Sequence, residues 1–355
     1  MIDYPAHLEM MWQKAIAPRE LNAPTVISTF AGGGGSSTGY LMAGYRELLA
    51  VEWDNNAVET LRLNYPHMNI YHGDIAKLSV DEVLQRIGLQ PGELDVLDGS
   101  PPCQGFSTAG KRDFSDDRNQ LFGEYVRLLR GLRPKVFVME NVSGMVKGKM
   151  KLIFADILRE LKASGYQVSA RLLNAKYFHV PQSRQRMIFV GVRDDLGIAP
   201  SHPKAVASPI AIGVAIGDMP LEQDETVQHF WIDEKGRTKT YDKADVAKQG
   251  HKYRLTYGRE SWNKPAGTLT KTGIGKPYLA NSNCHPLHTR TYSLRECARL
   301  QSFPDDFVFV GKWEGWDRIG NSVPPLFMEA IARHIRAEIL QRWATMTGNS
   351  PVLID

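Results

Sequence analysis

The segment around Cys103 has the residue types and spacing best suited to chemistry. The cysteine directly follows two prolines and is followed by Gln104 and Ser107, and the apolar segment 94–98 before it predicts a short buried strand. Proline fixes φ and stiffens the loop, and the carboxyl ends of strands are where open α/β sheets place their sites. The pattern therefore favours a presented thiol nucleophile over a core cysteine, which is the usual role of a free cysteine.

A glycine-rich loop follows the first predicted strand, 24–30, and precedes a predicted helix. Such a loop lets a ligand approach the backbone at a helix amino terminus. The loop does not match the GxGxxG fingerprint, because Ser37 and Thr38 occupy the positions where the third glycine would fall. A plain strand-to-helix turn is the structural alternative.

Acidic residues end the next two predicted strands. Glu52 ends the second strand, at the position where an acidic residue binds ribose hydroxyls, and Trp53 beside it is suited to stack on an adenine. Asp74 ends the third strand, in line with the same pocket. These residues predict a pocket for a nicotinamide cofactor or S-adenosylmethionine (SAM), and the structural alternatives are a solvated glutamate and a core tryptophan.

Two further groups lie at strand ends. Glu140 ends the apolar segment 136–139, where a carboxylate near the Cys103 loop would act on a ring nitrogen. Gln182, Arg184 and Arg186 alternate along an extended segment and so face one side, an arrangement suited to a phosphate or a base edge. A capping glutamate and solvated arginines are the structural alternatives.

Composition limits the class of protein. The 355 residues are 43% hydrophobic and 23% charged, with a net charge of +4, as in a globular protein that tolerates a polyanionic partner. Three cysteines without a CxxC pair predict neither a disulfide framework nor a zinc site, and no other metal site is indicated. With no secretory pattern and no membrane-length apolar run, a cytoplasmic protein is expected.

Alternating strand and helix patterns predict an α/β fold with a doubly wound, mostly parallel, Rossmann-like sheet. From about residue 194 the chain becomes richer in Pro, Gly and Thr, which predicts a second, smaller, loop-rich domain. The final amphipathic segment, 326–343, is expected to return to the first domain. We therefore predict one domain over 1–195, completed by 318–355, and another over 196–317.

Together and in this order, the motifs resemble the cytosine-C5 DNA methyltransferases over about 25–193 and 286–340. The segments that carry the resemblance are 30–35, 52–53, 73–75, 101–104, 140–142, 182–186, 295–305 and 320–325. One departure is Ser28, which stands where the family usually has an acidic residue.

The resemblance implies a reaction in which Cys103 is the nucleophile. C5 of cytosine is a poor nucleophile, and addition of the thiolate to C6 breaks the aromaticity and activates C5 to take a methyl group from SAM. Glu140 would hold N3, Arg184 would contact O2, and Arg186 would support Glu140 or the Cys103 loop. No residue is evident as the base that removes the C5 proton. The target base must be flipped out of the duplex.

The resemblance also assigns binding residues. The SAM site, which releases S-adenosylhomocysteine, would comprise Phe30, Ala31, Gly32, Gly33, Gly34, Glu52, Trp53, Asp74, Ile75, Asn321 and Ser322. The nucleotide would contact Pro102, Gln104, Ser107, Asn141, Gln182 and Thr268. The second domain would read the DNA sequence, whose identity the residues do not determine.

The enzyme is expected to act in a restriction-modification system or as a solitary methylase. The expected partners are double-stranded DNA and, in the first case, a restriction endonuclease that acts separately, and the expected state is a monomer. A tRNA-methylating branch of the family is disfavoured, because 283–285 is Asn-Cys-His rather than the branch's Cys-Phe-Thr. An inactive DNA-binding homologue would not need Cys103, Glu140 and Arg184. A nicotinamide oxidoreductase would explain the sheet and Glu52 but not the Pro-Pro-Cys-Gln segment.

Overall fold

The computed structural model of the chain describes residues 2–102, 117–146, 150–220, 230–232, 238–240, 260–271, 285–288 and 290–348. Cys103, Gln104 and Ser107 lie outside these residues. The chain divides into two compact units. One contains 13–174, 185–204 and 325–355, and we call it the sheet unit; the other contains 1–12, 175–184 and 205–324, and we call it the second unit.

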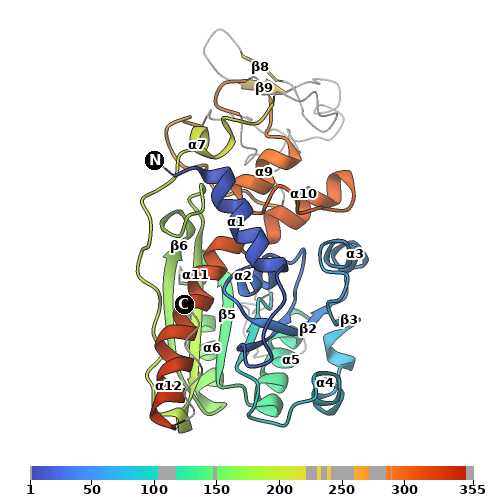
Figure 1. Cartoon of the computed structure of the whole chain (residues 1–355), viewed down its shortest axis with the longest axis vertical. Helices are drawn as coiled ribbons and strands as arrows, with labels where there is room; N and C mark the ends of the chain where they lie inside the picture. Colours follow the sequence, from blue (N-terminus) through green and yellow to red (C-terminus); the bar gives the residue numbers. More distant parts are fainter. Residues whose placement is uncertain are drawn as a thin grey trace. The chain divides into compact units, whose positions relative to one another are not determined.

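The sheet unit is built on seven strands in the order β3-β2-β1-β4-β5-β7-β6. Figure 1 labels β2, β3, β5 and β6 of this sheet. The strands are β1 (Thr25–Thr29), β2 (Arg46–Glu52), β3 (Ile70–His72), β4 (Val96–Gly99), β5 (Val136–Val142), β6 (Tyr166–Asn174) and β7 (Gln185–Arg193). Strands β1 to β5 run parallel to one another, and β7 runs antiparallel to both β5 and β6. The predicted doubly wound, mostly parallel α/β fold is confirmed.

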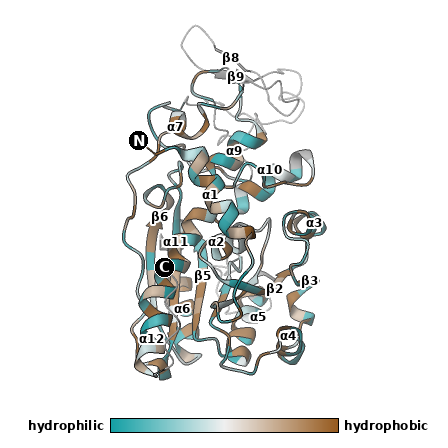
Figure 2. Ribbon diagram, viewed as in Figure 1, coloured by the Kyte–Doolittle hydropathy of each residue, from teal (hydrophilic) through white to brown (hydrophobic). Residues whose placement is uncertain are grey.

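Helices cover both faces of this sheet. They are α2 (Gly35–Met42), α3 (Asn55–Asn64), α4 (Val80–Ile87), α5 (Asp117–Leu132), α6 (Met150–Ala163), α11 (Pro325–Ile335) and α12 (Gln341–Met346). On one face, apolar side chains of β1, β2, β4 and β5 pack with those of α4, α5 and α6 in one buried core. Figure 2 colours the ribbon by hydropathy and shows hydrophobic stretches along β5 and α6. On the other face lies α2, whose Tyr40 reaches Asp98 of β4.

Helix α11, near the carboxyl terminus, belongs to the sheet unit. It packs against α2 so closely that a Cβ atom at Gly39 would lie 2.6 Å from the Pro325 carbonyl oxygen and from Met328. The Tyr45 hydroxyl donates to the Ala332 carbonyl oxygen at 2.9 Å. Gly39 is therefore required by the close approach of the two helices.

The second unit contains short elements joined by long loops. They are α7 (Ile212–Ile216), α9 (Leu294–Leu300), α10 (Lys312–Asn321) and a two-stranded sheet of β8 (Phe230–Ile232) and β9 (Thr238–Thr240). Helix α1 (Tyr4–Ile16) begins in this unit and crosses into the sheet unit after Trp12. The second unit also contains a cluster of aromatic rings from Phe303, Phe307 and Phe309.

The division differs from the boundaries that we expected at residues 195 and 318. Residues 1–12 and 175–184 belong to the second unit because they are bonded to it. The Tyr4 hydroxyl donates to the Arg299 carbonyl oxygen, and the Gln182 amide donates to the Leu300 carbonyl oxygen. Residues 185–204 stay with the sheet, because they include β7 and because His202 is hydrogen-bonded to Ser169 of β6.

Candidate active site

The candidate residues of the sheet unit lie along one edge of its sheet. Strands β1 to β5 are parallel, so the residues that follow them meet at their carboxyl ends. Antiparallel β7 begins at the same edge, where Arg186 is the register partner of Val142. The structure therefore places the glycine loop, Glu52, Asp74 and the end of β5 with Arg186 along this one edge of the sheet.

The glycine loop makes two left-handed turns before α2. Gly32 has φ +55° and Gly34, the residue before the helix, has φ +88°. Phe30 also adopts a positive φ of +56°, a conformation that costs a residue with a side chain about 1 kcal/mol or more. The Ala31 N–H donates to the Val51 carbonyl oxygen at 3.1 Å, which ties the loop to the end of β2. The loop backbone at the end of β1 therefore adopts a defined and locally strained conformation.

Glu52 binds this loop from the neighbouring strand. Its side chain accepts the Gly32 N–H at 2.7 Å on Oε2 and the N–H groups of Trp53 and Asp54 at 2.9 Å each on Oε1. Glu52 is 7% exposed, whereas the adjacent Trp53 is 76% exposed. A fixed carboxylate beside a solvent-exposed aromatic ring is a suitable surface for a nucleoside.

Asp74, the acidic residue that follows β3, caps a short turn. Asp74 precedes the 3-10 helix Ile75–Lys77, and its Oδ1 accepts the Ala76 N–H at 3.0 Å. Asp74 is exposed, while Ile75 is buried in the core shared with α5. The turn is therefore anchored in the core through Ile75, and it exposes the Asp74 carboxylate at the edge of the sheet.

An ion pair joins the ends of β5 and β7. Arg186 Nε lies 2.7 Å from Glu140 Oε1, and the two side chains are 13% and 10% exposed. Beside them, the Asn141 amide donates to the Pro101 carbonyl oxygen at 3.1 Å. This bond fixes the backbone two residues before Cys103. A carboxylate, its balancing guanidinium and the start of the cysteine loop are thus assembled at one strand end.

Two buried carboxyls lie deeper in this unit, and the sequence reasoning missed both. Asp98 of β4 is the register partner of Ser28, and its side chain accepts the Tyr40 hydroxyl at 3.3 Å. Burial raises its pKa to about 7, although hydrogen bonds from Ser36 and Tyr40 oppose the shift. An acidic residue at the end of the predicted buried strand, 94–98, was the signal that could have identified Asp98.

Glu47 of β2 is the second buried carboxyl. Burial raises its pKa to about 8, against the opposing effect of the Ser28 and Ser37 hydroxyls. Ser28 and Ser37 are both fully buried. Around Ser28, acidic groups are therefore contributed by the two neighbouring strands, β2 and β4, rather than by β1 itself.

Arg184 lies in the second unit and is nearly completely buried, at 1% exposure. Its Nη1 donates to the Leu269 carbonyl oxygen at 2.8 Å, and its Nη2 donates to the carbonyl oxygens of Gly320 and Ser322 at 3.0 Å each. We expected this side chain to face a base together with Arg186. The structure instead directs its guanidinium to three backbone carbonyls within the unit.

Gln182 extends the same network. Its Oε1 accepts the Leu269 N–H at 3.0 Å and its amide donates to Gln301 Oε1 at 2.5 Å. The Gln301 amide in turn donates to the Ser322 carbonyl oxygen at 2.6 Å. We call Gln182, Arg184 and Gln301 the buried amide–guanidinium network.

The remaining predicted residues of the second unit lie next to this network. The Thr268 hydroxyl donates to the Ser183 carbonyl oxygen at 2.8 Å. Ser322 is buried and its hydroxyl donates to the Arg318 carbonyl oxygen at 2.7 Å, while Asn321 beside it is exposed. The network therefore fixes the backbone at both the Thr268 and the Ser322 positions.

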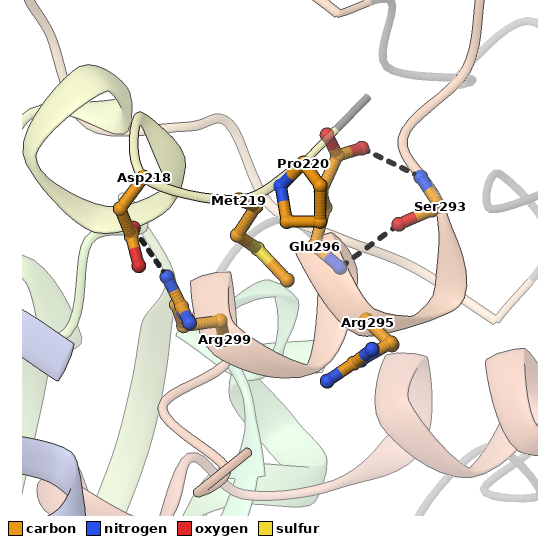
Figure 3. Close-up of a pocket in the computed structure, with 7 residues that line it drawn as sticks. All are labelled: Asp218, Met219, Pro220, Ser293, Arg295, Glu296 and Arg299. Carbon is orange, nitrogen blue, oxygen red and sulfur yellow. Dashed lines mark hydrogen bonds and ion pairs between the residues drawn. The ribbon is translucent and has the colours of Figure 1, made fainter. Parts of the chain in front are cut away.

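A small pocket of the second unit contains none of the predicted residues. It is lined by Asp218, Met219, Pro220, Ser293, Arg295, Glu296 and Arg299 (Figure 3). The dashed contacts in Figure 3 join Asp218 to Arg299 at 2.5 Å and form the capping box between Ser293 and Glu296. Glu296 is also paired with Arg290 at 2.7 Å. The capping box stabilises the start of α9, and the Asp218–Arg299 ion pair connects its last turn to the chain that follows α7.

No helix in the described part of the chain is both long and apolar enough to cross a membrane.

Comparison with known proteins identifies the family. The sequence model of the C-5 cytosine-specific DNA methylases matches residues 24–337. The chain is 36% identical over 330 residues to the Type II methyltransferase M1.HphI of Haemophilus parahaemolyticus, which covers 88% of this chain and 86% of that protein. It is 33% identical over 368 residues to the Type II methyltransferase M.DdeI of Desulfomicrobium norvegicum, covering 87% and 88%.

Solved structures agree with this relationship. A DNA modification methyltransferase encoded within a prophage, from E. coli, matches with a TM-score of 0.70 and 26% identity over 90% of this chain and all of that one. The DNMT2 structure from Spodoptera frugiperda matches with a TM-score of 0.63 over 86% of this chain and 98% of that one, at 18% identity, a likeness of fold. The chain therefore belongs to the C-5 cytosine-specific DNA methylases and is an enzyme of that class.

Proposed function

We propose that this enzyme transfers a methyl group from SAM to C5 of a flipped-out cytosine in a specific sequence of double-stranded DNA. The observation that carries the proposal is the Glu140–Arg186 ion pair at 2.7 Å, next to the Asn141 bond to Pro101. A pyrimidine ring at this strand end would meet a carboxylate, a guanidinium and the cysteine loop together.

Cys103 is the proposed nucleophile, whose thiolate adds to C6 of the cytosine and leaves again when the C5 proton is lost. Glu140 would hydrogen-bond N3 as charge develops on the ring, and Arg186 would balance the charge of the carboxylate and approach O2. Arg184 would act indirectly, because its guanidinium is engaged by the carbonyls of Leu269, Gly320 and Ser322. We thus assign to Arg186 the ring contact that the sequence suggested for Arg184.

The residues at the ends of β1, β2 and β3 fit a nucleoside cofactor. SAM supplies an electrophilic methyl group when it is bound. The Glu52 carboxylate accepts three N–H groups, which leaves about one of its roughly four lone-pair sites for a ribose hydroxyl. Trp53 offers an exposed face to the adenine, and Asp74 with Ile75 would meet the adenine edge. Phe30 and the glycine loop, 31–34, would line the same site.

The names of the curated relatives suggest a biological setting. M1.HphI and M.DdeI are both Type II methyltransferases. We propose that this enzyme likewise protects DNA at one recognition sequence, with a restriction endonuclease as a separately acting partner. Residues 260–271, which contain Thr268, belong to the unit that we propose to contact the nucleotide.

The decisive experiment is transfer of labelled methyl groups from SAM to unmethylated duplex DNA and, in parallel, to tRNA. We expect label in DNA, its complete loss in Cys103→Ala, and modified cytosines that share one sequence. Cys103→Ala should still bind the cofactor, because the proposed cofactor contacts lie on other residues. Label only in tRNA would move the enzyme to the RNA-methylating branch, and turnover by Cys103→Ala would remove Cys103 as the nucleophile.

A further inference from the structure

An arginine of α5 holds the turn to which we assign the adenine. Arg127 Nη2 donates to the Ile75 carbonyl oxygen at 3.0 Å and to the Leu78 carbonyl oxygen at 2.8 Å. These contacts span 52 and 49 residues of sequence. One nitrogen therefore bonds to both ends of the 3-10 helix Ile75–Lys77, at its first residue and at Leu78, the residue after the helix.

The turn depends on such an outside donor because it is short. Within it, the Lys77 N–H donates to the Asp74 carbonyl oxygen at 3.0 Å and the Leu78 N–H donates to the Ile75 carbonyl oxygen at 3.2 Å. A helix end leaves carbonyl groups that need partners from elsewhere. Leu78 is fully buried, so water cannot readily replace the arginine at its carbonyl.

The arginine itself is held in place. Its Nε lies 2.6 Å from Glu124 Oε2, one turn earlier on α5, and its side chain is 35% exposed. Arg130, three residues further along the same helix, makes different contacts. It bonds to Glu160 at 2.7 Å and to Ser164 at 3.1 Å, and its side chain is 48% exposed. Arg130 therefore provides a matched control on the same element.

We propose that Arg127 is a positioning residue for cofactor recognition, which sets the place of the Asp74–Ile75 turn and thereby the enzyme's preference for adenine over other purines. The proposal rests on the proposed function, because it takes the nucleoside of SAM as the ligand of this turn. Arg127 acts through the backbone and has no contact with the reacting atoms.

The expected selectivity follows from hydrogen-bond chemistry. The exocyclic amino group of adenine donates, and the Asp74 carboxylate is an acceptor. Hypoxanthine has a carbonyl oxygen at that position, so it would place two acceptors against each other. A binding site discriminates against an analogue that lacks a hydrogen-bonding group only while the protein's own bonding groups are held in place. Without Arg127 the turn is freer to move, and the discrimination should fall.

The test measures binding of S-adenosylhomocysteine and of S-inosylhomocysteine to the full-length protein by calorimetry. The variants are Arg127→Met, Arg127→Lys, Glu124→Gln and, as the control, Arg130→Met. We expect the dissociation constant of the adenosyl compound to rise about tenfold in Arg127→Met, which corresponds to about 1.4 kcal/mol. The preference for adenosyl over inosyl should fall by a similar factor in that variant, and Arg127→Lys should recover part of both.

The preference ratio separates positioning from a general loss of stability, which would leave the ratio unchanged. An unchanged ratio in Arg127→Met, Arg127→Lys and Glu124→Gln, or an equal change in Arg130→Met, would overturn the proposal. If Arg127→Met does not fold, Arg127→Lys and Glu124→Gln carry the same test. A wild-type protein that binds neither compound would instead overturn the proposed cofactor, and this inference with it.

Discussion

Arg184 and Arg186 are two residues apart in the sequence, yet they serve different purposes in the structure. Arg186 pairs with the Glu140 carboxylate at the sheet edge. Arg184 is buried in the second unit and donates to three backbone carbonyls. A guanidinium bound to fixed carbonyls holds the chain in one conformation, whereas one paired with a carboxylate at a strand end supplies charge where a ring can be bound. The comparison shows that two arginines of one motif can have entirely different partners, one a carboxylate and the other backbone carbonyls.

Glu140 and Asp98 form a parallel contrast among the carboxyls. Glu140 lies at the end of β5 and is paired with an arginine. Asp98 lies within β4, and burial raises its pKa to about 7. The arginine compensates the charge of Glu140 at the proposed site, whereas Asp98 is hydrogen-bonded by hydroxyl groups.

The largest effect should follow from breaking the ion pair. Arg186→Met should reduce methyl transfer by about 10³-fold, because loss of one group that stabilises developing charge has an effect of this size. Glu140→Gln should have a similar effect, and the double variant should be little worse than either single variant. The measurement is the single-turnover rate with labelled SAM, together with the melting temperature as a control. Equal activity of Arg186→Met and wild type would show that Arg186 has no role in the reaction.

Arg184→Met should act mainly on stability. Its removal leaves the Leu269, Gly320 and Ser322 carbonyls without their buried donor, and we expect a loss of about 3 kcal/mol or more in the free energy of unfolding. Urea denaturation followed by fluorescence would measure this, with Arg186→Met as the matched control two residues further along the chain. A stable Arg184→Met protein that has lost only activity would assign Arg184 the chemical role after all.

The smallest effect concerns pH. Asp98 and Glu47 hold their protons more tightly in the folded chain, so their contribution to stability is full below the unfolded pKa values of about 4. This contribution is lost as pH rises through about 7 for Asp98 and about 8 for Glu47. Asp98→Asn cannot ionise and still accepts the Tyr40 hydroxyl. Its melting temperature should therefore fall less than that of wild type between pH 6 and pH 9.

The control for this experiment is Glu59→Gln, which changes an exposed carboxyl on α3. It should follow the wild-type pH dependence throughout. If Asp98→Asn also followed the wild-type curve, Asp98 would be charged in the folded chain at neutral pH, and its contrast with Glu140 would disappear.

The fold was predictable from the sequence because its signals are local. Apolar strands alternating with amphipathic helices predicted the parallel sheet, and strand ends predicted which side of it carries Glu52, Asp74 and Glu140. The antiparallel insertion of β7 between β5 and β6 was not predictable in this way, because strand order depends on long-range pairing. The division between the units also escaped prediction, since 175–184 joins the second unit through hydrogen bonds to residues about a hundred positions away.

The sequence alone determined the family, because several motifs of specific residue types occur in one order along the chain. It also determined the residue types available for chemistry, among them a thiol, a carboxylate and two arginines. Only the tertiary structure decided that Arg186 pairs with Glu140 while Arg184 is buried among carbonyls, and that Arg127 grips the turn after β3. The physical reason is that spacing along a strand specifies the direction of a side chain, whereas its partners come from distant segments that meet only in the folded chain.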